Sequence, residues 1–399
     1  MSDPYVIFER IALSEQSYLS QWYLDAQMII TSKRYNELRK VQQQLYKAIN
    51  YFIKHYRLYE HIFRISDPVR RILDVCKPYP YRPGTYRPDF LINRELGLKI
   101  CEIGARFPLN GYFMSGIAEF IGRNRYKYKS YFGKPVYEYF LGYLLSYWGN
   151  IEVLYVLKGE DRPCDIKYYI PFFDQLGIKV KILTPPDMDG ISFSSSKYGV
   201  LNEFNQMEIE ALHDNVLRMI AASVSLNDMR TIFLIHDKRF LAVLSDPDFL
   251  TQCLSSEEIK FLQPYLIPTY TSIQSPEIWE KAKKEKDNWI LKHCLLGKSE
   301  EIYMGSKCSE GEWLALFVPS VRDSMVLQPL IDQRQIASTI AGKQYHDFVV
   351  GTLLCFDDRF FGTGIFRTSS YEITNRIDDR KMASCFTDNY VDKVDYFIL

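Results

Sequence analysis

Residues 87–104 read RPDFLINRELGLKICEIG, and their pattern predicts a β-hairpin. The segments 87–92 and 98–103 are short and apolar, and the second alternates as strands do. Between them lies a turn that ends at Gly97. Each predicted strand carries one carboxylate, Asp89 on the first and Glu102 on the second. Because a hairpin can bring residues of its two strands side by side on one face, we expect these carboxylates to converge.

Two converging carboxylates repel each other unless a cation lies between them. Mg²⁺ takes one or two carboxylates together with phosphate oxygens, so the pair suits a magnesium site. Arg87 and Arg106 flank the pair and could bind phosphates or a substrate carboxylate. The same residues also fit a surface hairpin whose acids pair with these two arginines. The hairpin alone does not decide between the two interpretations.

The segments outside the hairpin predict α/β and α+β architecture. Residues 1–75 are predicted to be helical, and 35–63 contains no Gly or Pro. Two apolar strands, 151–157 and 178–183, are joined by a helix over 165–176 and Gly177, which is a βαβ unit. A helix is expected over 208–223. Strands are expected over 231–235, 289–292, 301–304, 314–318 and 326–331, and a hairpin over 348–356 and 360–366. The charged run 281–286 predicts a solvated helix face.

Composition and charge argue against several classes of protein. The chain has 399 residues, of which 49 are basic and 49 acidic, so it lacks the global basic field that binds nucleic acids or anionic membranes. Its 8 cysteines form no C-x-x-C pair, which favours a reduced, cytoplasmic protein. No signal peptide is recognised, and no apolar stretch approaches the roughly 20 residues that span a bilayer.

Familiar nucleotide and metal motifs are absent, including the P-loop, a G-x-G-x-x-G after a strand, and H-E-x-x-H. Two lysines follow or end predicted strands instead: Lys238 begins a helix, and Lys292 precedes the loop LLGKS at 295–299. Such a lysine and loop suit phosphates, because the ammonium meets the α/β phosphates and the loop amides cradle the others. Taken alone, each lysine also fits an ordinary surface charge.

Two later segments add to this set. VLQPLI at 326–331, which includes Gln328, ends in a hinge-like stretch whose backbone groups could bind an adenine edge. GTGIFRTS at 362–369 carries Arg367, and an arginine there could stabilise charge on a transferring phosphoryl group. Alone, the first also fits a buried strand and the second a solvated strand end.

In combination, these segments resemble the circularly permuted ATP-grasp ligases, in particular the synthetase domain of glutathionylspermidine synthase. That family's R-F-D-F and L-E-x-N segments correspond to RPDF at 87–90 and CEIG at 101–104. Its S-x-K-A corresponds to HDKR at 236–239, and its strand lysine before a Gly-rich loop to Lys292 with Gly297 and Ser299. Its C-terminal I-R-E and I-T-x-N correspond to FRT at 366–368 and ITN at 373–375. The metal carboxylates precede the ATP lysines, the reverse of ordinary ATP-grasp enzymes, and the resemblance spans about residues 86–380.

The resemblance implies a circularly permuted ATP-grasp fold with five parts. These are a helical N-terminal region (1–85), a metal-binding hairpin with its following helices (86–150), a βαβ pre-ATP-grasp-like subdomain (151–230), an ATP-binding lid region (231–345) and the C-terminal part of the core (346–399). The chain has no room for the amidase domain of glutathionylspermidine synthase. Gly104 also stands where the family has its third metal ligand, an Asn. Asn110, Asn375 or water could take over that role.

The implied activity is that of an ATP-dependent carboxylate–amine ligase, which forms an amide through an acyl phosphate and releases ADP and phosphate. ATP and Mg²⁺ are the implied cofactors, and a small-molecule acid and amine are the substrates. The sequence does not reveal the oligomeric state, although the helical N-terminal region could serve as a homodimer surface. The implied roles are metal binding by Asp89 and Glu102, ATP binding by Lys238, Lys292, Gly297, Lys298, Ser299 and Gln328, catalysis by Arg367 and Arg87, and substrate binding by Arg106 and Asn110.

Two other functions fit parts of the sequence. Gly104 favours a nucleotide- or partner-binding protein on the same fold that performs no catalysis. A thiol enzyme that uses Cys101 or Cys294 is the third alternative. Cys294 follows His293 directly, and adjacent residues of a strand point to opposite faces, so these two would not pair.

Overall fold

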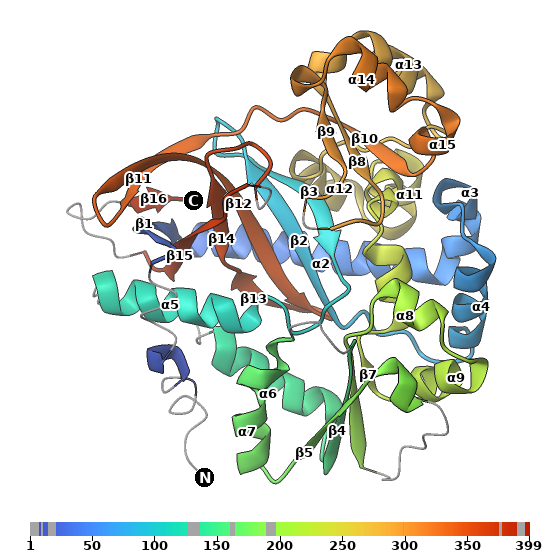
Figure 1. Ribbon diagram of the computed structural model, residues 1–399, viewed down its shortest axis with the longest axis vertical. Coiled ribbons are helices and arrows are strands. Elements are labelled where there is room, and N and C mark those ends of the chain that lie inside the picture. Colours follow the sequence, from blue (N-terminus) through green and yellow to red (C-terminus); the bar gives the residue numbers. More distant parts are fainter. Residues whose placement is uncertain are drawn as a thin grey trace.

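The computed structural model describes residues 8, 11–14, 21–126, 136–159, 164–188, 197–297, 299–374, 377–388 and 396–399. These residues form a mixed α/β structure of three sheets, of nine, four and three strands, with helices packed around them (Figure 1). Within these ranges, no helix is long and apolar enough to cross a bilayer.

The nine-stranded sheet is curled, and the predicted hairpin forms one of its edges (Figure 1). Its strands are β1 (Tyr23–Ile30), β2 (Thr85–Ile92), β3 (Leu98–Gly104), β11 (Gln335–Ile340), β12 (Lys343–Phe356), β13 (Arg359–Thr363), β14 (Phe366–Ser369), β15 (Arg380–Phe386) and β16 (Tyr396–Ile398). β2 and β3 pair antiparallel, which confirms the hairpin. The long strand β12 pairs with β2, β11, β13 and β14 and therefore lies at the centre of the sheet.

Helices cover both faces of this sheet. α2 (Ser32–His55) packs on one face, where its Phe52 shares a cluster with Phe90 of β2 and Leu353 of β12. α5 (Tyr112–Tyr126) and α6 (Val136–Trp148) cover the other face, where Phe140 packs near Leu354. Leu353 and Leu354 are neighbours on β12, and a strand sends neighbouring side chains to opposite faces. The α2 side is completed by α3 (Glu60–Phe63), α4 (Asp67–Cys76), α10 (Arg239–Leu244), α11 (Pro247–Cys253) and α12 (Ser256–Leu262).

The four-stranded sheet contains the predicted βαβ unit. Its strands run parallel in the order β5-β4-β6-β7 and comprise β4 (Val153–Leu157), β5 (Lys179–Leu183), β6 (Tyr198–Asn202) and β7 (Ser225–Leu226). Between β4 and β5, a 3₁₀ turn (Asp165–Tyr168) leads into α7 (Ile170–Gln175). Gly177 ends this helical segment with φ +72°, a left-handed conformation that favours glycine. The helices α8 (Gln206–Glu210) and α9 (Asp214–Ala222) follow β6.

The three-stranded sheet stands above the end of the hairpin (Figure 1). It is antiparallel in the order β10-β8-β9, with β8 (Trp289–His293), β9 (Ile302–Met304) and β10 (Met325–Pro329). Its own core includes Trp279, Trp313 and Leu327. The helices α13 (Pro276–Lys284), α14 (Glu310–Ala315) and α15 (Pro319–Arg322) cover it. Most of the charged run 281–286 lies exposed on or just after α13, as predicted.

Several sequence-based expectations are wrong. Residues 1–75 are not all helical, because Tyr23–Ile30 is the strand β1, which pairs in parallel with β15 and β16. The expected strand 231–235 is a π-helical turn, Thr231–Ile235, with all five residues buried. An apolar run of this length does not distinguish a buried strand from a buried helix. The expected strand 314–318 overlaps the end of α14, which begins with a Ser309–Glu312 capping box. The expected helix 208–223 is divided into α8 and α9.

Replacing Gly351 with alanine should destabilise the nine-stranded sheet. Gly351 lies on β12 between β2 and β14, and an added Cβ would overlap the ring of Phe90 and lie 2.7 Å from Cε1 of Phe366. Overpacking of this kind costs about 1–3 kcal/mol. We expect urea denaturation of Gly351→Ala to show that loss. The matched control is Gly142→Ala in α6, where a Cβ meets nothing within 4 Å and stability should not fall. Equal stabilities of the two variants would contradict the packing described here.

Candidate active site

Asp89 and Glu102 lie directly opposite each other on β2 and β3. Asp89 is buried, whereas the Glu102 side chain is 33% exposed. A β-bulge follows this pair, because Asp89 pairs with Glu102 but Phe90 pairs with Ile100. Cys101 is therefore the extra residue, and its carbonyl oxygen accepts hydrogen bonds from Lys292 Nζ and Gln328 Nε2, both at 3.4 Å. The bulge thus links the carboxylate pair to the three-stranded sheet.

Strand β12 holds Asp89 from its other side. Thr352 lies opposite Asp89 in the β2–β12 pairing, and its Oγ1 donates to Asp89 Oδ1 at 2.9 Å. Arg367 of β14 lies opposite Val350 of β12, and its Nη2 donates to Asp89 Oδ2 at 2.5 Å. The Asp89 carboxylate is therefore satisfied by a guanidinium and a hydroxyl from two neighbouring strands.

Two buried lysines approach the same place from other elements. Lys238 precedes α10, and its Nζ lies 3.4 Å from Glu102 Oε2 and donates to Leu296 O at 2.6 Å. Its backbone N–H also donates to Cys294 O at 2.9 Å, which ties the start of α10 to the end of β8. Lys292 of β8 bonds the bulge carbonyl described above. Only 4% of Lys238 and 6% of Lys292 is exposed, so both depend on these polar contacts.

The electrostatics of the cluster favour the ionised form of Glu102. Burial alone would raise the pKa of Glu102, but Lys238, Lys292 and Arg367 outweigh it and lower that pKa to about 2. For Arg367, burial opposes the charge, whereas Asp89 and Glu102 raise the pKa of the guanidinium above its ordinary value. Glu102 therefore stays a carboxylate and Arg367 a guanidinium across the physiological pH range.

His236 adjoins this cluster and is uncharged. Its Nδ1 accepts a hydrogen bond from the backbone N–H of Ala105 at 3.2 Å, and its buried Nε2 has no hydrogen-bond partner among the described residues. Burial, Arg106 and Lys238 lower the pKa of His236 to about 3. Sequence analysis gave no role to this residue, because an isolated histidine carries no spacing signal.

A cavity of about 90 Å³ opens on the cluster. Five of the predicted site residues line it, namely Asp89, Glu102, Lys292, Ser299 and Arg367. The remaining lining residues are largely apolar and come from both sheets and the segment after β14: Leu91, Cys101, Ile290, Ile302, Gln333, Val350, Glu372, Ile373 and Thr374. Ser299 closes one side, because its Oγ donates to Thr374 O at 2.6 Å. Lys298 and Asn375 lie outside the described residues.

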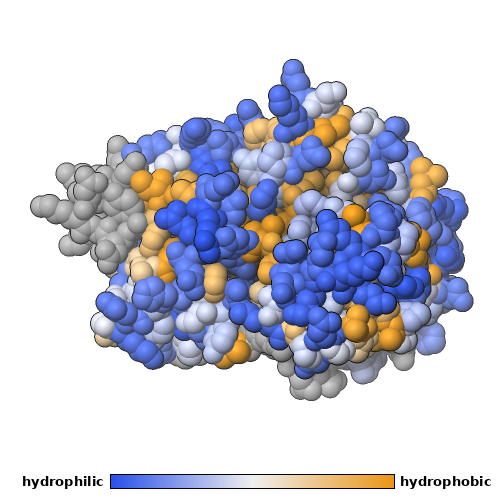
Figure 2. All heavy atoms as spheres, turned by 90° about the horizontal axis from the view of Figure 1, so that it is seen from above, coloured by the Kyte–Doolittle hydropathy of each residue, from blue (hydrophilic) through white to orange (hydrophobic). Residues whose placement is uncertain are grey.

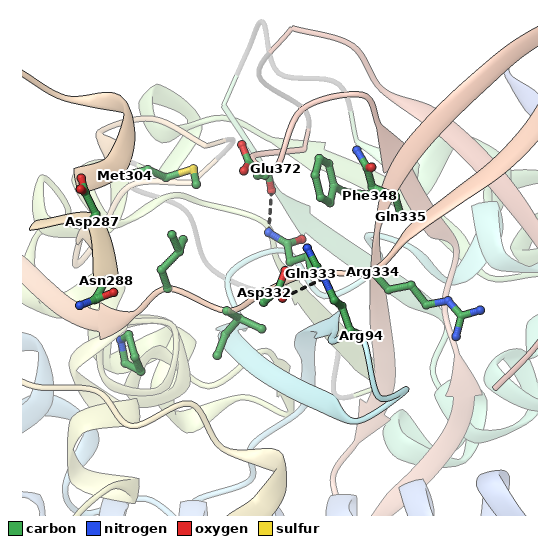
Figure 3. Close-up of a pocket in the computed structure, with 13 residues that line it drawn as sticks. Arg94, Asp287, Asn288, Met304, Asp332, Gln333, Arg334, Gln335, Phe348 and Glu372 are labelled. Atoms are coloured by element: carbon green, nitrogen blue, oxygen red, sulfur yellow. Dashed lines mark hydrogen bonds and ion pairs between the residues drawn. The ribbon is translucent and has the colours of Figure 1, made fainter.

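A larger cleft of about 890 Å³ continues from this cavity, and Gln333 and Glu372 line both. Figure 3 shows Asp287, Asn288 and Met304 on one side of this cleft and Phe348 on the other. Its volume lies within the roughly 300–1,000 Å³ of typical ligand sites. Seen from above, hydrophobic side chains gather in the middle of the molecule between hydrophilic surfaces (Figure 2).

Other predicted site residues lie beside the cavity rather than on its lining. Gln328 is fully buried in β10, and its Nε2 also donates to Thr269 Oγ1 at 2.8 Å. Arg106 Nη1 donates to Gln206 Oε1 at 3.1 Å, and its Nη2 lies 3.8 Å from where a Cβ on Gly297 would be. Arg87 lies near Gly104, and Asn110 is exposed to solvent. Thr352, Gln333 and Glu372 are site residues that sequence reasoning missed, since nothing in their local pattern sets them apart.

The donor set fits a hard divalent cation only in part. Carboxylate oxygens are the ligands that Mg²⁺ prefers, and one or two suffice when phosphate oxygens supply others. Among the described residues, no group of three or more His, Cys, Asp or Glu side chains could hold a metal ion. At the position of the missing Asn, Arg87 Nη2 lies 3.1 Å from where a Cβ on Gly104 would be. The guanidinium therefore fills space that a longer side chain at position 104 would need.

Comparison with solved structures identifies the class of fold. The chain is similar to a glutathione synthetase-like effector (GSS30) from Globodera pallida, with a TM-score of 0.58 and 11% identity over 97% of this chain and 98% of that one. At this identity the likeness shows the fold alone, which is glutathione synthetase-like.

Sequence comparisons then point to a particular relative. A family model described as the AnkG N-terminal domain matches residues 41–234. The chain is also 24% identical over 370 residues to the ATP-grasp enzyme ankG of Aspergillus thermomutatus. This match covers 76% of this chain and 75% of that protein. These comparisons agree with the resemblance found in the sequence: the relative is named an ATP-grasp enzyme, and the solved structure shares a glutathione synthetase-like fold.

Replacing His236 should make the free energy of unfolding depend less on pH below pH 7. An unfolded histidine binds a proton below about pH 6.5, whereas folded His236 binds one only near pH 3. The unfolded state therefore holds more protons in this window, and the free energy of unfolding falls as the pH is lowered. Between pH 7 and pH 5, wild type should lose up to about 2 kcal/mol more than His236→Asn, which keeps an acceptor for Ala105. Identical pH profiles in urea denaturation would contradict the uncharged buried state.

Proposed function

We propose that this protein is an ATP-dependent carboxylate–amine ligase on a circularly permuted ATP-grasp fold. It would join an acid and an amine into an amide and release ADP and phosphate. The observation that carries this proposal is the facing pair Asp89 and Glu102 at the end of a cleft between two sheets, with Lys238, Lys292 and Arg367 around it. Hard oxygen donors beside several cations suit a metal–polyphosphate ligand better than a neutral one.

The nucleotide phosphates would occupy the 90 Å³ cavity. Lys238 and Lys292 approach it from two elements and would bind phosphate oxygens, and the loop that contains Gly297, Lys298 and Ser299 would cover them. The nucleoside would extend into the larger cleft, which shares Gln333 and Glu372 with the cavity. The apolar side chain of Met304 lines that cleft and would pack against the base.

The end of β10 offers backbone groups that would select adenine. Leu330 N–H donates to Asn288 O at 2.8 Å, on the β8 side. Alternation within β10 turns the carbonyl of Pro329 away from β8, and the N–H of Ile331, just beyond the strand, would supply a donor beside it. The carbonyl would accept a hydrogen bond from the amino group of adenine, and the N–H would donate one to the neighbouring ring nitrogen. The edge of guanine presents the opposite pattern. Both residues line the larger cleft.

Asp89 and Glu102 would hold Mg²⁺, which supplies charge neutralisation at the phosphates. The substrate carboxylate would attack the γ-phosphate, so that a new O–P bond forms and ADP leaves. Arg367 would stabilise the charge on the transferring phosphoryl group, which is the kind of contact whose loss costs about 10²–10³ in rate. The amine would then attack the acyl carbon, and phosphate would leave as the amide forms.

The acid substrate would lie beyond the phosphates, near Arg87 and Arg106. Arg106 lies between the hairpin, Gln206 of α8 and the loop at Gly297, so it could bind a carboxylate and respond to loop closure. Asn110 is exposed on the same connection after β3. The homodimer that the sequence allows stays a prediction.

A second candidate is a nucleotide-binding protein without catalysis. The Arg87 guanidinium beside Gly104 favours it, because the third metal ligand of the family is replaced by a positive group. The thiol-enzyme alternative is disfavoured. Burial raises the pKa of Cys101 to about 11 and that of Cys294 to about 12, so both stay protonated thiols at neutral pH.

Calorimetric titration of Mg·ADP tests the proposal without knowledge of the substrates. We expect micromolar binding to wild type, a loss of about tenfold or more in Lys292→Met, and weaker dependence on Mg²⁺ in Glu102→Gln. Mg·GDP should bind about tenfold or more weakly than Mg·ADP, because the backbone donor and acceptor would be mismatched. The matched control is Lys281→Met on the exposed face of α13, which should bind as wild type does. Absence of ADP binding to wild type would overturn the proposal.

Hydroxylamine trapping then separates the two candidates. An acyl phosphate reacts with hydroxylamine to give a hydroxamate. A ligase that is given ATP, hydroxylamine and the carboxylic acid that is its substrate should therefore produce ADP and the hydroxamate of that acid. Binding of Mg·ADP with no turnover across a broad set of carboxylic acids would favour the protein without catalysis.

A further inference from the structure

We infer that the acid substrate carries a second carboxylate, which does not react, and that Arg106 and the Nε2–H of His236 bind it. This inference rests on the proposed function, because it names the chemical class of that reaction's acid, a dicarboxylate. Three groups at one end of the hairpin carry it: the guanidinium of Arg87, the guanidinium of Arg106 and the imidazole of His236.

Arg87 stands beside the candidate metal ligands. It lies two residues before Asp89 on β2, so the two side chains share a face of the sheet, and Gly104 lies opposite Arg87 on β3. Arg87 Nη2 lies 3.1 Å from where a Cβ on Gly104 would be, and Nη1 lies 3.3 Å from where a Cβ on Gly111 would be. Gly111 has φ +96°, a left-handed conformation that favours glycine. Two glycines therefore make room for this guanidinium.

The Arg87 guanidinium suits the carboxylate that reacts. No other described residue forms a hydrogen bond or an ion pair with it. Asp165 lies within electrostatic range, but burial raises the pKa of this carboxyl and so favours its uncharged form. A substrate carboxylate bound by Arg87 would lie next to Asp89 and Glu102, and hence next to the phosphate that it attacks.

His236 presents a buried N–H donor. Its backbone N–H closes the π-helical turn Thr231–Ile235 by donating to Thr231 O at 3.1 Å. Its Nδ1 accepts the N–H of Ala105 at 3.2 Å, and because a backbone N–H can only donate, Nδ1 carries no hydrogen. The ring hydrogen therefore lies on Nε2, which is buried and has no hydrogen-bond partner among the described residues. A ligand oxygen at this position would remove the cost of that unpaired donor.

The charges around the imidazole favour an anionic oxygen. Arg106, Lys238 and Arg87 lie within electrostatic range of His236, as does the carboxylate of Glu102. Lys238 is paired with Glu102 at 3.4 Å. The two arginines therefore leave positive charge beside the Nε2–H, and a hydrogen bond to an ionised oxygen is stronger than one to a neutral acceptor.

The protein holds Arg106 in position for such an anion. Its Nη1 donates to Gln206 Oε1 at 3.1 Å, and its guanidinium lies over the ring of Phe107, 4.5 Å from the centroid. Arg106 directly follows Ala105, whose N–H orients His236, so one short connection after β3 positions both donors. Gly104, which lies opposite Arg87, is two residues before Arg106. The two anion positions therefore lie within the reach of one small molecule.

Dicarboxylates and their monoamides are matched probes, because each pair has the same length and differs by one negative charge. The pairs are succinate and succinamate, glutarate and glutaramate, and adipate and adipamate. In calorimetric titrations without nucleotide, we expect wild type to bind at least one dicarboxylate about tenfold or more tightly than its monoamide. Equal affinities within every pair, as expected if the amine substrate supplied the second carboxylate, would overturn the inference. Failure of all three dicarboxylates to bind would do the same.

Variants of the two donors test the assignment by the ratio of the dicarboxylate affinity to the monoamide affinity. His236→Asn keeps an acceptor for Ala105 but removes the Nε2–H, so the ratio should fall about tenfold. His236→Gln places an amide N–H near the position of Nε2 and should retain part of the ratio. Arg106→Gln should lower it as well. The matched control is Arg218→Gln on the exposed face of α9, which should bind as wild type does.

The ratio separates recognition from a merely structural role, because distortion of the site would weaken both members of a pair together. If His236→Asn does not fold, Arg106→Gln provides the same test. A ratio that stays at the wild-type value in the folded variants would overturn the inference. Absence of ADP binding to wild type contradicts the proposed function instead. The dicarboxylate titrations contain no nucleotide, so the two failures are distinguishable.

Discussion

The pairing register of β12 is the constraint on which the candidate site depends. β12 lies between β2 and β14, and this register places Thr352 beside Asp89 and brings Arg367 within reach of the same carboxylate. A slip of one residue would turn Thr352 to the opposite face of the sheet. Gly351, the residue between these contacts, leaves room on that opposite face for Phe90 and Phe366, whose rings meet edge to face at 6.0 Å. Packing on one face of the sheet therefore specifies the register that assembles the charges on the other.

Burying these charges costs desolvation free energy and contributes little to the stability of the fold. Lys238, Lys292 and Asp89 are nearly buried, and ion pairs in such places add little net stability because of the cost of desolvation. Each group has a partner within the protein: Asp89 has Arg367, Glu102 has Lys238, and Lys292 has the bulge carbonyl of Cys101. Three elements far apart in the chain supply these partners. An arrangement of this kind is more readily explained by a charged ligand than by a contribution to stability.

The sequence predicts the local parts of this structure better than the contacts between distant parts. The hairpin follows from alternation and from Gly97, and the pairing of Asp89 with Glu102 lies within its reach. The βαβ unit follows from apolar strands that flank a helix and Gly177. Strand β1 was missed because its neighbours β15 and β16 lie at the other end of the chain, and the π-helical turn at Thr231–Ile235 has the same apolar composition as a strand.

The candidate site was predictable only in part for the same reason. Asp89 and Glu102 form a local signal, whereas the contact of Lys238 with Glu102 and the roles of Thr352 and Glu372 depend on tertiary packing. Only the resemblance to a family placed Lys238, Lys292 and Arg367 in one site, and their roles there stay predictions. Gln328 shows the limit of such transfer, because its side chain bonds Cys101 and Thr269 instead of lining the cavity.

The most direct test of the central claim is a crystal structure of the protein with Mg²⁺ and ADP. The account predicts phosphates among Lys238, Lys292 and Arg367, with the adenine edge on the backbone of Pro329 and Ile331. It also predicts that the metal ion contacts Asp89 and Glu102. A nucleotide bound elsewhere, or one bound here with no metal ion on these carboxylates, would contradict it.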